Sequence, residues 1–270
     1  MTELKSILRL ARNDFSYFFR TKWLMAILLS LNISDMLVVA LVYSHGMINT
    51  GIIANYFQFF VPSVVIMGLF AAALDTGRRI WLAIREGVVQ YYLSLPISLE
   101  GIVVAYMLAG GLAAVVYSSA LLFIMIPVQA LGLIAIPLQA ISNTLVLLPF
   151  LFVLAMGLAG IAATLAAFAS THGEYFFAYQ QVVQLMLLTF STLFYPIDKI
   201  KGFFPPFVTT IISANPLSLA VGAIRDYTFA GKPLQPLYLL NILVASLPFA
   251  VIGAAAYLYA LRAFQVKGKL

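Results

Sequence analysis

The chain has 270 residues, of which 63% are hydrophobic and 9% are charged, whereas soluble domains average roughly 45–50% and 25%. The net charge of +6 is scattered rather than gathered on one basic face, which disfavours nucleic-acid binding. The chain has no cysteine, which excludes disulfides and thiolate chemistry. Long apolar runs recur along the whole sequence, so we expect an all-α membrane protein with a single transmembrane domain over residues 1–270.

Residues 1–22 predict an amphipathic helix that lies on the membrane without crossing it. Apolar residues at helical spacing run beside a basic stripe: Leu4, Leu8, Ala11, Phe15 and Phe18, with Lys5, Arg9 and Arg12. Such an interfacial helix turns its apolar side toward the acyl chains and its cations toward anionic head groups of membrane lipids. A basic cytoplasmic tail without membrane contact is the alternative.

Six apolar stretches are long enough to span a membrane, at about 23–43, 56–76, 101–127, 138–169, 177–196 and 235–261. Pro149 is expected to kink the fourth. The fourth stretch also carries alanines at four-residue spacing, at Ala155, Ala159, Ala163 and Ala167. Small residues let a neighbouring helix approach closely. That neighbour belongs either to the same chain or to a second subunit.

The distribution of lysine and arginine predicts the orientation. With six spans and a cytoplasmic N-terminus, eleven of the 15 basic residues fall in cytoplasmic segments and four fall outside. Cytoplasmic segments carry an excess of Lys and Arg. We therefore expect a multi-pass protein of the cytoplasmic membrane with both termini in the cytoplasm.

The stretch after the fifth span predicts a re-entrant hairpin. It contains two apolar pieces, 203–213 and 216–229, each too short to span a membrane. Pro205, Pro206 and Pro216 stand where short helices would begin. Because irregular backbone at membrane depth must be buried in protein or face water, we expect a hairpin over about 203–229 that dips back from the outer surface.

Few polar side chains lie inside the expected spans. Asp35 is the one charged residue well inside a span, either as a packing or interface group or as a substrate contact. In the fifth span, Gln180, Gln184 and Thr192 share roughly one helical face. The candidates for a dimer seam or a transport pathway are therefore Asp35, Gln180, Gln184 and Thr192, with packing inside the chain as the alternative. At the end of the second span, Asp75 is expected to pair with Arg78 and Arg79.

Sequence motifs give no sign of catalysis. The chain has no G-x-x-x-x-G-K-[ST] sequence, so it cannot bind and hydrolyse ATP through a P-loop of its own. Its two histidines, His45 and His172, fall in loops expected on opposite sides of the membrane. We expect neither an enzyme activity nor a cofactor or metal bound by this chain.

The connection between the second and third spans reads GRRIWLAIREGVVQYYLSLPISL, residues 77–99. Ile80, Ile84, Val88 and Tyr91 have the spacing of a short amphipathic helix over about 78–95, closed before Pro96 because proline disfavours helix in the residue preceding it. A short helix across the cytoplasmic ends of two spans is a suitable lever for a soluble partner. An ordinary interfacial connection is the alternative.

Two sets of motifs resemble those of the ABC type 2 exporter permeases. Gly87 followed by Pro96-Ile97-Ser98 is similar to the connector E-x-G-T … P-[IL]-S of that family. Four later pieces are similar to its ending F-[FY]-P … [LP]-P … N-P-L-[ST] … A-[IL]-R, namely Phe194-Tyr195-Pro196, Pro205-Pro206, Asn215-Pro216-Leu217-Ser218 and Ala223-Ile224-Arg225. The expected order of elements also agrees along nearly the whole chain. The connector departs from the family pattern, because Arg85 stands at the place of Glu and Val88 replaces Thr.

The resemblance implies the permease subunit of an ABC exporter. Such a subunit pairs with a second copy of itself and with two separate nucleotide-binding ATPase subunits, which hold ATP and Mg. The two permeases would form the pathway for an amphipathic, lipid-linked or drug-like substrate. The resemblance assigns coupling to the ATPase to Arg85, Glu86, Gly87, Tyr91 and Pro96. It assigns the outer gate hairpin to Pro196, Pro205, Pro206, Asn215, Pro216 and Arg225.

An ion-coupled secondary transporter is the alternative function. It predicts an internal repeat, discontinuous helices and charges near the membrane midplane, whereas this sequence offers only Asp35 and no convincing repeat. An ABC importer permease is disfavoured, because the longer Glu-Ala-Ala loop of importers has no match here.

Overall fold

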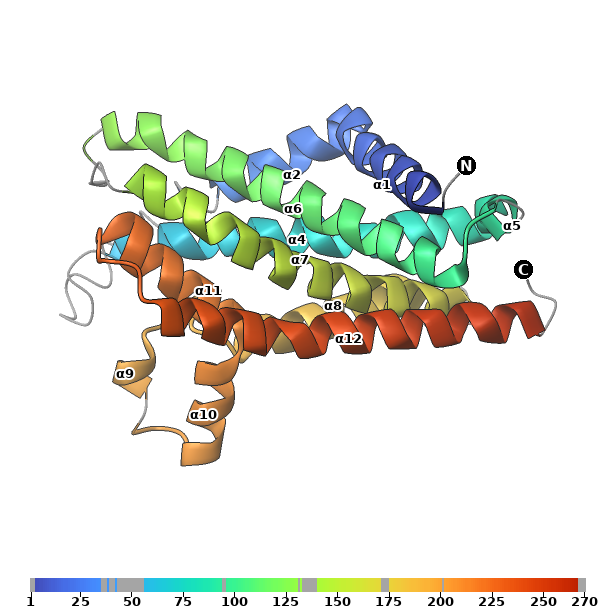
Figure 1. Cartoon of the computed structure of the whole chain (residues 1–270). Helices are drawn as coiled ribbons and strands as arrows, with labels where there is room; N and C mark the ends of the chain where they lie inside the picture. Colours follow the sequence, from blue (N-terminus) through green and yellow to red (C-terminus); the bar gives the residue numbers. More distant parts are fainter. Residues whose placement is uncertain are drawn as a thin grey trace.

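The computed structural model describes residues 3–34, 38, 42, 56–93, 96–130, 132, 140–170, 175–200 and 202–266. Most of these residues are helical, and none of them lies in a strand. The elements are α1 (Glu3–Arg20), α2 (Lys22–Ser34), α4 (Tyr56–Arg85), α5 (Val88–Leu93), α6 (Leu99–Ala130), α7 (Ala140–Ser170), α8 (Phe176–Thr189), α9 (Ile197–Ile200), α10 (Pro206–Ala214), α11 (Pro216–Ala223), the π-helix η3 (Ile224–Phe229) and α12 (Pro236–Val266). The long helices lie side by side, and α1 begins and α12 ends toward the end of the bundle that carries α5 (Figure 1).

Within the described residues, four helices are long and apolar enough to cross a membrane: Gln58–Arg85, Leu99–Ile124, Ser142–Ala169 and Pro236–Ala263. A fifth crossing is added if the bent pair Pro206–Ala214 and Pro216–Phe229, which meet at 61°, is one broken span. The architecture is therefore that of a multi-pass helical membrane protein with four or five candidate spans.

The four long helices correspond to the second, third, fourth and sixth spans expected from the sequence. The first expected span, 23–43, is described only in part, and its apolar helix Met25–Ser34 is short. The fifth, 177–196, contains α8, which has 14 residues and ends at Thr189. At about 1.5 Å per residue, α8 reaches only about 21 Å, less than the hydrocarbon core of about 30 Å. Where the helix ends, the side chain of Asn215 donates to the carbonyls of Leu187 and Phe190.

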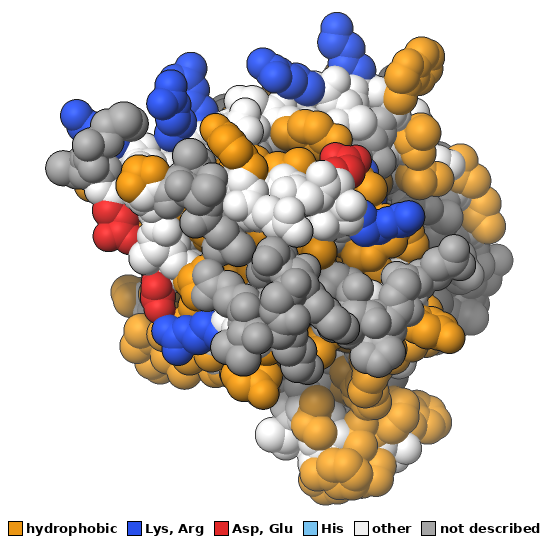
Figure 2. All heavy atoms as spheres, turned by 90° about the vertical axis from the view of Figure 1, so that its right-hand side faces the viewer, with side chains coloured by type: hydrophobic (Ala, Val, Ile, Leu, Met, Phe, Trp, Pro, Cys, Tyr) orange, Lys and Arg blue, Asp and Glu red, His pale blue; other side chains and the backbone are white. Residues whose placement is uncertain are grey.

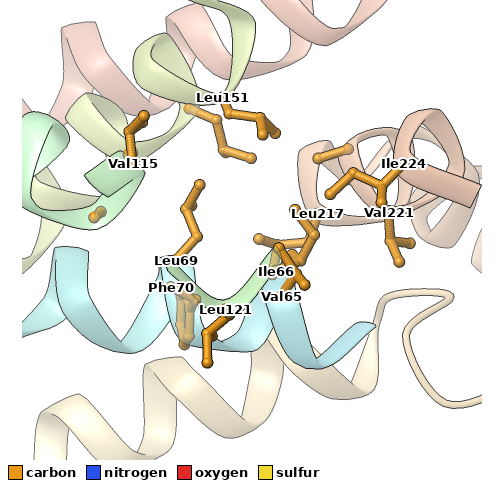
Figure 3. Close-up of a cluster of buried hydrophobic side chains, with 14 of the residues drawn as sticks. Val65, Ile66, Leu69, Phe70, Val115, Leu121, Leu151, Leu217, Val221 and Ile224 are labelled. Atoms are coloured by element: carbon orange, nitrogen blue, oxygen red, sulfur yellow. The ribbon is translucent and has the colours of Figure 1, made fainter. Parts of the chain in front are cut away.

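The most buried of the long helices is α4. Of its most apolar stretch 83% is buried, against 22% for α12, which lies at the edge. Figure 3 shows part of the core around α4, with Leu217 of α11 beside Val65 and Ile66 of α4, and Val221 next to Ile224. The fully buried Leu69 of α4 belongs to the same apolar cluster.

The two limbs of the hairpin have different surroundings. The second limb, α11 with η3, is embedded in the core, and its Leu217, Val221 and Ile224 are at most 1% exposed. The first limb, α10, projects from the bundle together with α9 (Figure 1). On α10, Phe207 is 66% exposed and Ile211 is 52% exposed. One limb therefore packs as a core helix, and the other presents an apolar surface.

Small residues bring the long helices into close contact. A Cβ atom added to Gly253 of α12 would lie 2.5 Å from the carbonyl carbon of Gly160 in α7. The hydroxyl of Thr164 donates to the carbonyl of Gly253 at 3.0 Å across the same contact. The alanine row of α7 (Ala155, Ala159, Ala163 and Ala167) is fully buried within the chain. These alanines therefore serve packing inside the subunit, where α7 contacts α4, α6 and α12.

The contact of α7 with α12 predicts the effect of Gly253→Ala. The added methyl group meets backbone atoms that cannot rotate away, and overpacking of this kind costs about 1–3 kcal/mol. The gain in helix propensity is at most about 1 kcal/mol, so we expect a lower midpoint of thermal unfolding in detergent. Gly202→Ala is the control, because a Cβ at that position meets nothing within 4 Å. Equal midpoints for the two variants would contradict the close contact.

Candidate functional site

Polar side chains gather at both ends of the bundle. The connector end comprises α1, the C-terminal part of α4, and α5. The hairpin end comprises the N-terminal part of α4, residues 190–196, and the α10–α11–η3 segment. Basic side chains stand out along the edge that α1 forms, at the top of Figure 2. The residues that the sequence assigned to ATPase coupling lie at the first end, and those assigned to the outer gate lie at the second.

A buried ion cluster joins α1 to α4 at the connector end. Arg79 is 4% exposed and donates two parallel hydrogen bonds to the Asp14 carboxylate, Nε to Oδ1 at 3.1 Å and Nη2 to Oδ2 at 2.9 Å. Its Nη1 donates to Asp75 at 2.8 Å, and Arg78 donates to the other oxygen of Asp75 at 2.6 Å. The pairing of Asp75 with both arginines agrees with the sequence expectation. The further partner of Arg79, Asp14 of α1, was not predicted from the sequence.

Burial and charge act in opposite directions on Asp14. Burial raises the pKa of this carboxyl, whereas the charge and hydrogen bonds of Arg79 lower it. Two parallel charge-assisted bonds hold the carboxylate in one position. The pair therefore fixes the rotation of α1 about its axis relative to α4.

The connector begins where α4 ends. This helix continues through Arg85, beyond the boundary near residue 76 expected from the sequence, and the separate helix α5 covers only Val88–Leu93 of the expected 78–95. The break is at Gly87, whose φ of 72° is left-handed and is readily adopted only by glycine. Arg85 and Glu86 are exposed just before this turn. The predicted coupling residues therefore form a tight corner between two helices.

A cavity of about 490 Å³ separates α5 from α1. Its lining comes from α1, from α5 and from the segment between α5 and α6: Ser6, Arg9, Leu10, Asn13, Tyr91, Tyr92, Pro96 and Ile97. Tyr91 is 62% exposed. Burial raises the pKa of the Tyr92 hydroxyl, which hydrogen-bonds to Asn13. Tyr91 and Pro96, two of the predicted coupling residues, thus lie on an open surface shared with the N-terminal helix.

An aromatic cluster connects the end of α4 to the start of α8. The Trp81 ring stacks on Phe176, with ring centroids 5.9 Å apart, and meets Phe177 edge-on at 5.7 Å. The guanidinium carbon of Arg85 lies 4.8 Å from the centroid of the Trp81 ring. A predicted coupling residue is therefore in contact with the aromatic residue on which α8 begins.

At the hairpin end, Arg225 holds three chain segments together. It donates to the carbonyls of Phe59 (3.1 Å), Thr192 (3.0 Å) and Leu193 (3.1 Å) and to the Ser63 hydroxyl (2.8 Å). Its guanidinium also lies 3.6 Å from the centroid of the Phe59 ring. All four hydrogen-bond acceptors are uncharged. The side chain therefore acts as a rigid multiple donor that ties η3 to α4 and to the segment after α8.

Asn215, ten residues earlier in the chain, performs a similar task. Its amide nitrogen donates to the carbonyls of Leu187 (3.1 Å) and Phe190 (2.6 Å) at the end of α8. Its side-chain oxygen accepts from the backbone nitrogen of Leu217 at 2.9 Å, which caps the N-terminus of α11. The helices α10 and α11 begin at Pro206 and Pro216, while Pro196 and Pro205 directly precede α9 and α10.

The predicted dimer or pathway residues do not form one group. Thr192 is buried at the hairpin end, where its backbone nitrogen donates to Ser218 and its carbonyl accepts from Arg225. Gln180 and Gln184 are partly buried on α8. Asp35 lies outside the described residues, as do His45 and His172.

Two polar residues of these clusters, Asp14 and Ser63, were not predicted from the sequence. Asp14 shares a helical face with Leu10 and Phe18, the three buried residues of α1, and an acid on an otherwise apolar face is a usable sign of a buried ion pair. Ser63 receives a hydrogen bond from Arg225 and donates to Leu193 at 2.6 Å. Nothing in its local sequence distinguishes it from other serines in apolar helices.

No group of His, Cys, Asp and Glu side chains in the described residues could hold a metal ion. The chain matches no protein-family model, and no curated protein matches it.

The ion cluster predicts a strong effect of Arg79→Met. The substitution leaves Asp14 buried without its partner and leaves Asp75 with Arg78 alone, and an uncompensated buried charge costs about 3–5 kcal/mol. We expect a large fall in the midpoint of thermal unfolding, and partial recovery when Asp14→Asn is added. Arg262→Met is the control, since its pair with Glu100 is exposed and contributes at most about 1 kcal/mol. A double variant no more stable than Arg79→Met would contradict the role assigned to Asp14.

At the hairpin end, Arg225→Lys is expected to destabilise the protein although the charge is kept. Lysine cannot reproduce the planar donor geometry of arginine, so some carbonyls lose their partner at about 1–3 kcal/mol each. The consequence is local, and limited proteolysis should cut residues 190–214 faster in this variant. Lys232→Gln, which removes an exposed pair with Asp226, should leave the cleavage rate unchanged. Equal rates in both variants would rule out the proposed tie.

Proposed function

We propose that this chain is the permease subunit of an ABC exporter. In this proposal two copies form the pathway for an amphipathic, lipid-linked or drug-like substrate, and two separate ATPase subunits supply the energy. The observation that carries the proposal is the tight corner at Gly87, where α4 passes into α5 with Arg85 and Glu86 exposed. A short helix at the end of a long apolar helix offers a soluble partner a point of attachment.

The connector end has the properties that a coupling element needs. The corner is stiff, because Arg85 rests on Trp81 and Arg79 anchors the preceding turn to α1. Its outer surface is open, since Tyr91 and Glu86 are exposed. A partner bound there acts on α4, the most buried of the long helices.

The hairpin end supports the second part of the proposal. Asn215 and Arg225, which the motif resemblance assigns to the outer hairpin, each join two or more segments through several hydrogen bonds. A hairpin held in this way can close the outer side of a pathway. The expected re-entrant hairpin and the six-span ABC type 2 exporter fold remain part of the proposal, with both termini in the cytoplasm.

The proposed contact with a second copy involves α8. Among the described residues, α8 packs mainly on α7 and makes a smaller contact with α4. Its side chains Val182, Leu185 and Met186 are all more than half exposed. The side-chain oxygen of Gln180 is buried without a hydrogen-bond partner among the described residues. A twin helix packed here would cover these apolar side chains.

An ion-coupled secondary transporter is less well supported. It requires a carboxylate that can release and bind an ion during transport. The two buried carboxylates of the described residues, Asp14 and Asp75, are both held by arginine.

The proposal predicts that Glu86→Arg weakens association with the ATPase subunits. Reversal of a charge at a partly desolvated contact costs about 2–5 kcal/mol, whereas membrane insertion should be unaffected. Co-purification of a tagged chain with its ATPase measures the effect. Asp198→Arg, the same reversal on α9 at the hairpin end, is the control. If the Glu86→Arg chain recovered as much ATPase as the wild-type chain and the Asp198→Arg control, the connector would be ruled out as the docking site.

The proposed dimer predicts cross-linking through α8. The chain has no cysteine, so single cysteines can be placed at will. A cysteine at Leu185, which is 68% exposed, should form a disulfide-linked dimer in the membrane. A cysteine at Val251 on α12, which is 63% exposed, should not. Cross-linking at Val251 and not at Leu185 would place the interface on α12 instead of α8.

A further inference from the structure

An apolar groove runs between α1 and α6. Its volume is about 320 Å³, and its lining comes from α1, α6 and α7: Leu8, Ala11, Arg12, Phe15, Leu108, Ala109, Leu112 and Phe152. Seven of these eight side chains are hydrophobic, and the eighth is a cation. Leu8 is 54% exposed and Leu112 is 45% exposed. The groove is thus an open apolar trough with a single positive charge.

The groove continues into a row of apolar side chains on α6. Val104, Leu112 and Val116 lie at multiples of four residues and are each at least 40% exposed, and Leu108 between them is partly exposed. Residues four apart share one face of a helix. In a membrane, this exposed face of α6 would be open to acyl chains. A chain lying along it would pass directly into the groove beneath α1.

Arg12 gives the groove its charge. It is exposed and has no ion-pair partner among the described residues. The two acids described on α1 are engaged elsewhere, because Glu3 accepts from the backbone nitrogen of Ser98 and Asp14 pairs with Arg79. The local field along this face of α1 is therefore positive, with Lys5 and Arg9 also exposed. Such a field attracts anionic head groups.

We propose that this groove is a binding site for an anionic membrane phospholipid. One acyl chain lies in the trough between α1 and α6, and Arg12 binds the phosphate of the head group. The site holds a structural lipid on the side of α1 away from the α1–α5 cavity. The proposal does not depend on the exporter function, since it rests on the groove, the exposed row of α6 and the free cation.

Native mass spectrometry of the full chain, released from detergent micelles, tests the site with two lipids of identical acyl chains. Phosphatidylglycerol carries a net negative charge, and phosphatidylcholine carries none. The wild-type chain should retain one phosphatidylglycerol in preference to phosphatidylcholine. Arg12→Gln should lower phosphatidylglycerol retention about fivefold, the contribution of one basic residue near an anionic lipid surface, without changing phosphatidylcholine. Leu112→Asn should lower retention of both lipids, because it places an amide in the trough.

Arg9→Gln is the matched control. Arg9 is exposed on the same helix but lines the cavity beside α5, so its loss should leave retention unchanged. Equal losses for Arg9→Gln and Arg12→Gln would show a diffuse basic surface and overturn the site. Displacement of the lipid by glycerol phosphate would show a phosphate site without a bound acyl chain, which also overturns it. Lipid retained by monomers but absent from dimers would assign the groove to a second copy instead.

Discussion

The structure depends on the pairing of backbone carbonyls where the chain leaves helical form after α8. A buried carbonyl without a hydrogen-bond donor costs about 1–3 kcal/mol. Asn215 and Arg225 supply side-chain donors to the carbonyls of Leu187, Phe190, Thr192 and Leu193. Because both donors belong to the α11–η3 limb, the break can exist only while that limb is embedded in the core. The irregular segment and the buried helix therefore stabilise each other.

The other end of the bundle uses charge for a similar purpose. Apolar packing alone would let α1 slide or rotate on α6, because one apolar contact is much like another in a lipid environment. The pair of Asp14 and Arg79 admits one arrangement only. The desolvation of these charges offsets much of the attraction between them. Their contribution is therefore better described as fixing the position of α1 than as stabilising the fold.

Local patterns in the sequence predicted a large part of this arrangement. The helical class, the four long apolar helices and the pairing of Asp75 with Arg78 and Arg79 follow from hydropathy and from spacing within one helix. The residue at which α4 ends could not be predicted in this way. The amphipathic pattern of residues 80–91 is helical on both sides of Gly87, and only the left-handed turn at Gly87 divides it into two helices. The partner of Arg79 lies 65 residues away, and periodicity carries no information about contacts between distant helices.

The aromatic contact at Trp81 has a mechanical consequence. The start of α8 rests on this ring through Phe176, and the end of α8 is held by Asn215. A helix is stiff along its axis, because compression would strain every hydrogen bond of its ladder. With 14 residues, α8 is a strut of about 21 Å held at both ends by side chains of other elements. A push along the axis of α8 at one end is therefore transmitted to the other end. A pull is transmitted only as long as the contacts of Phe176 with Trp81 and of Leu187 with Asn215 hold.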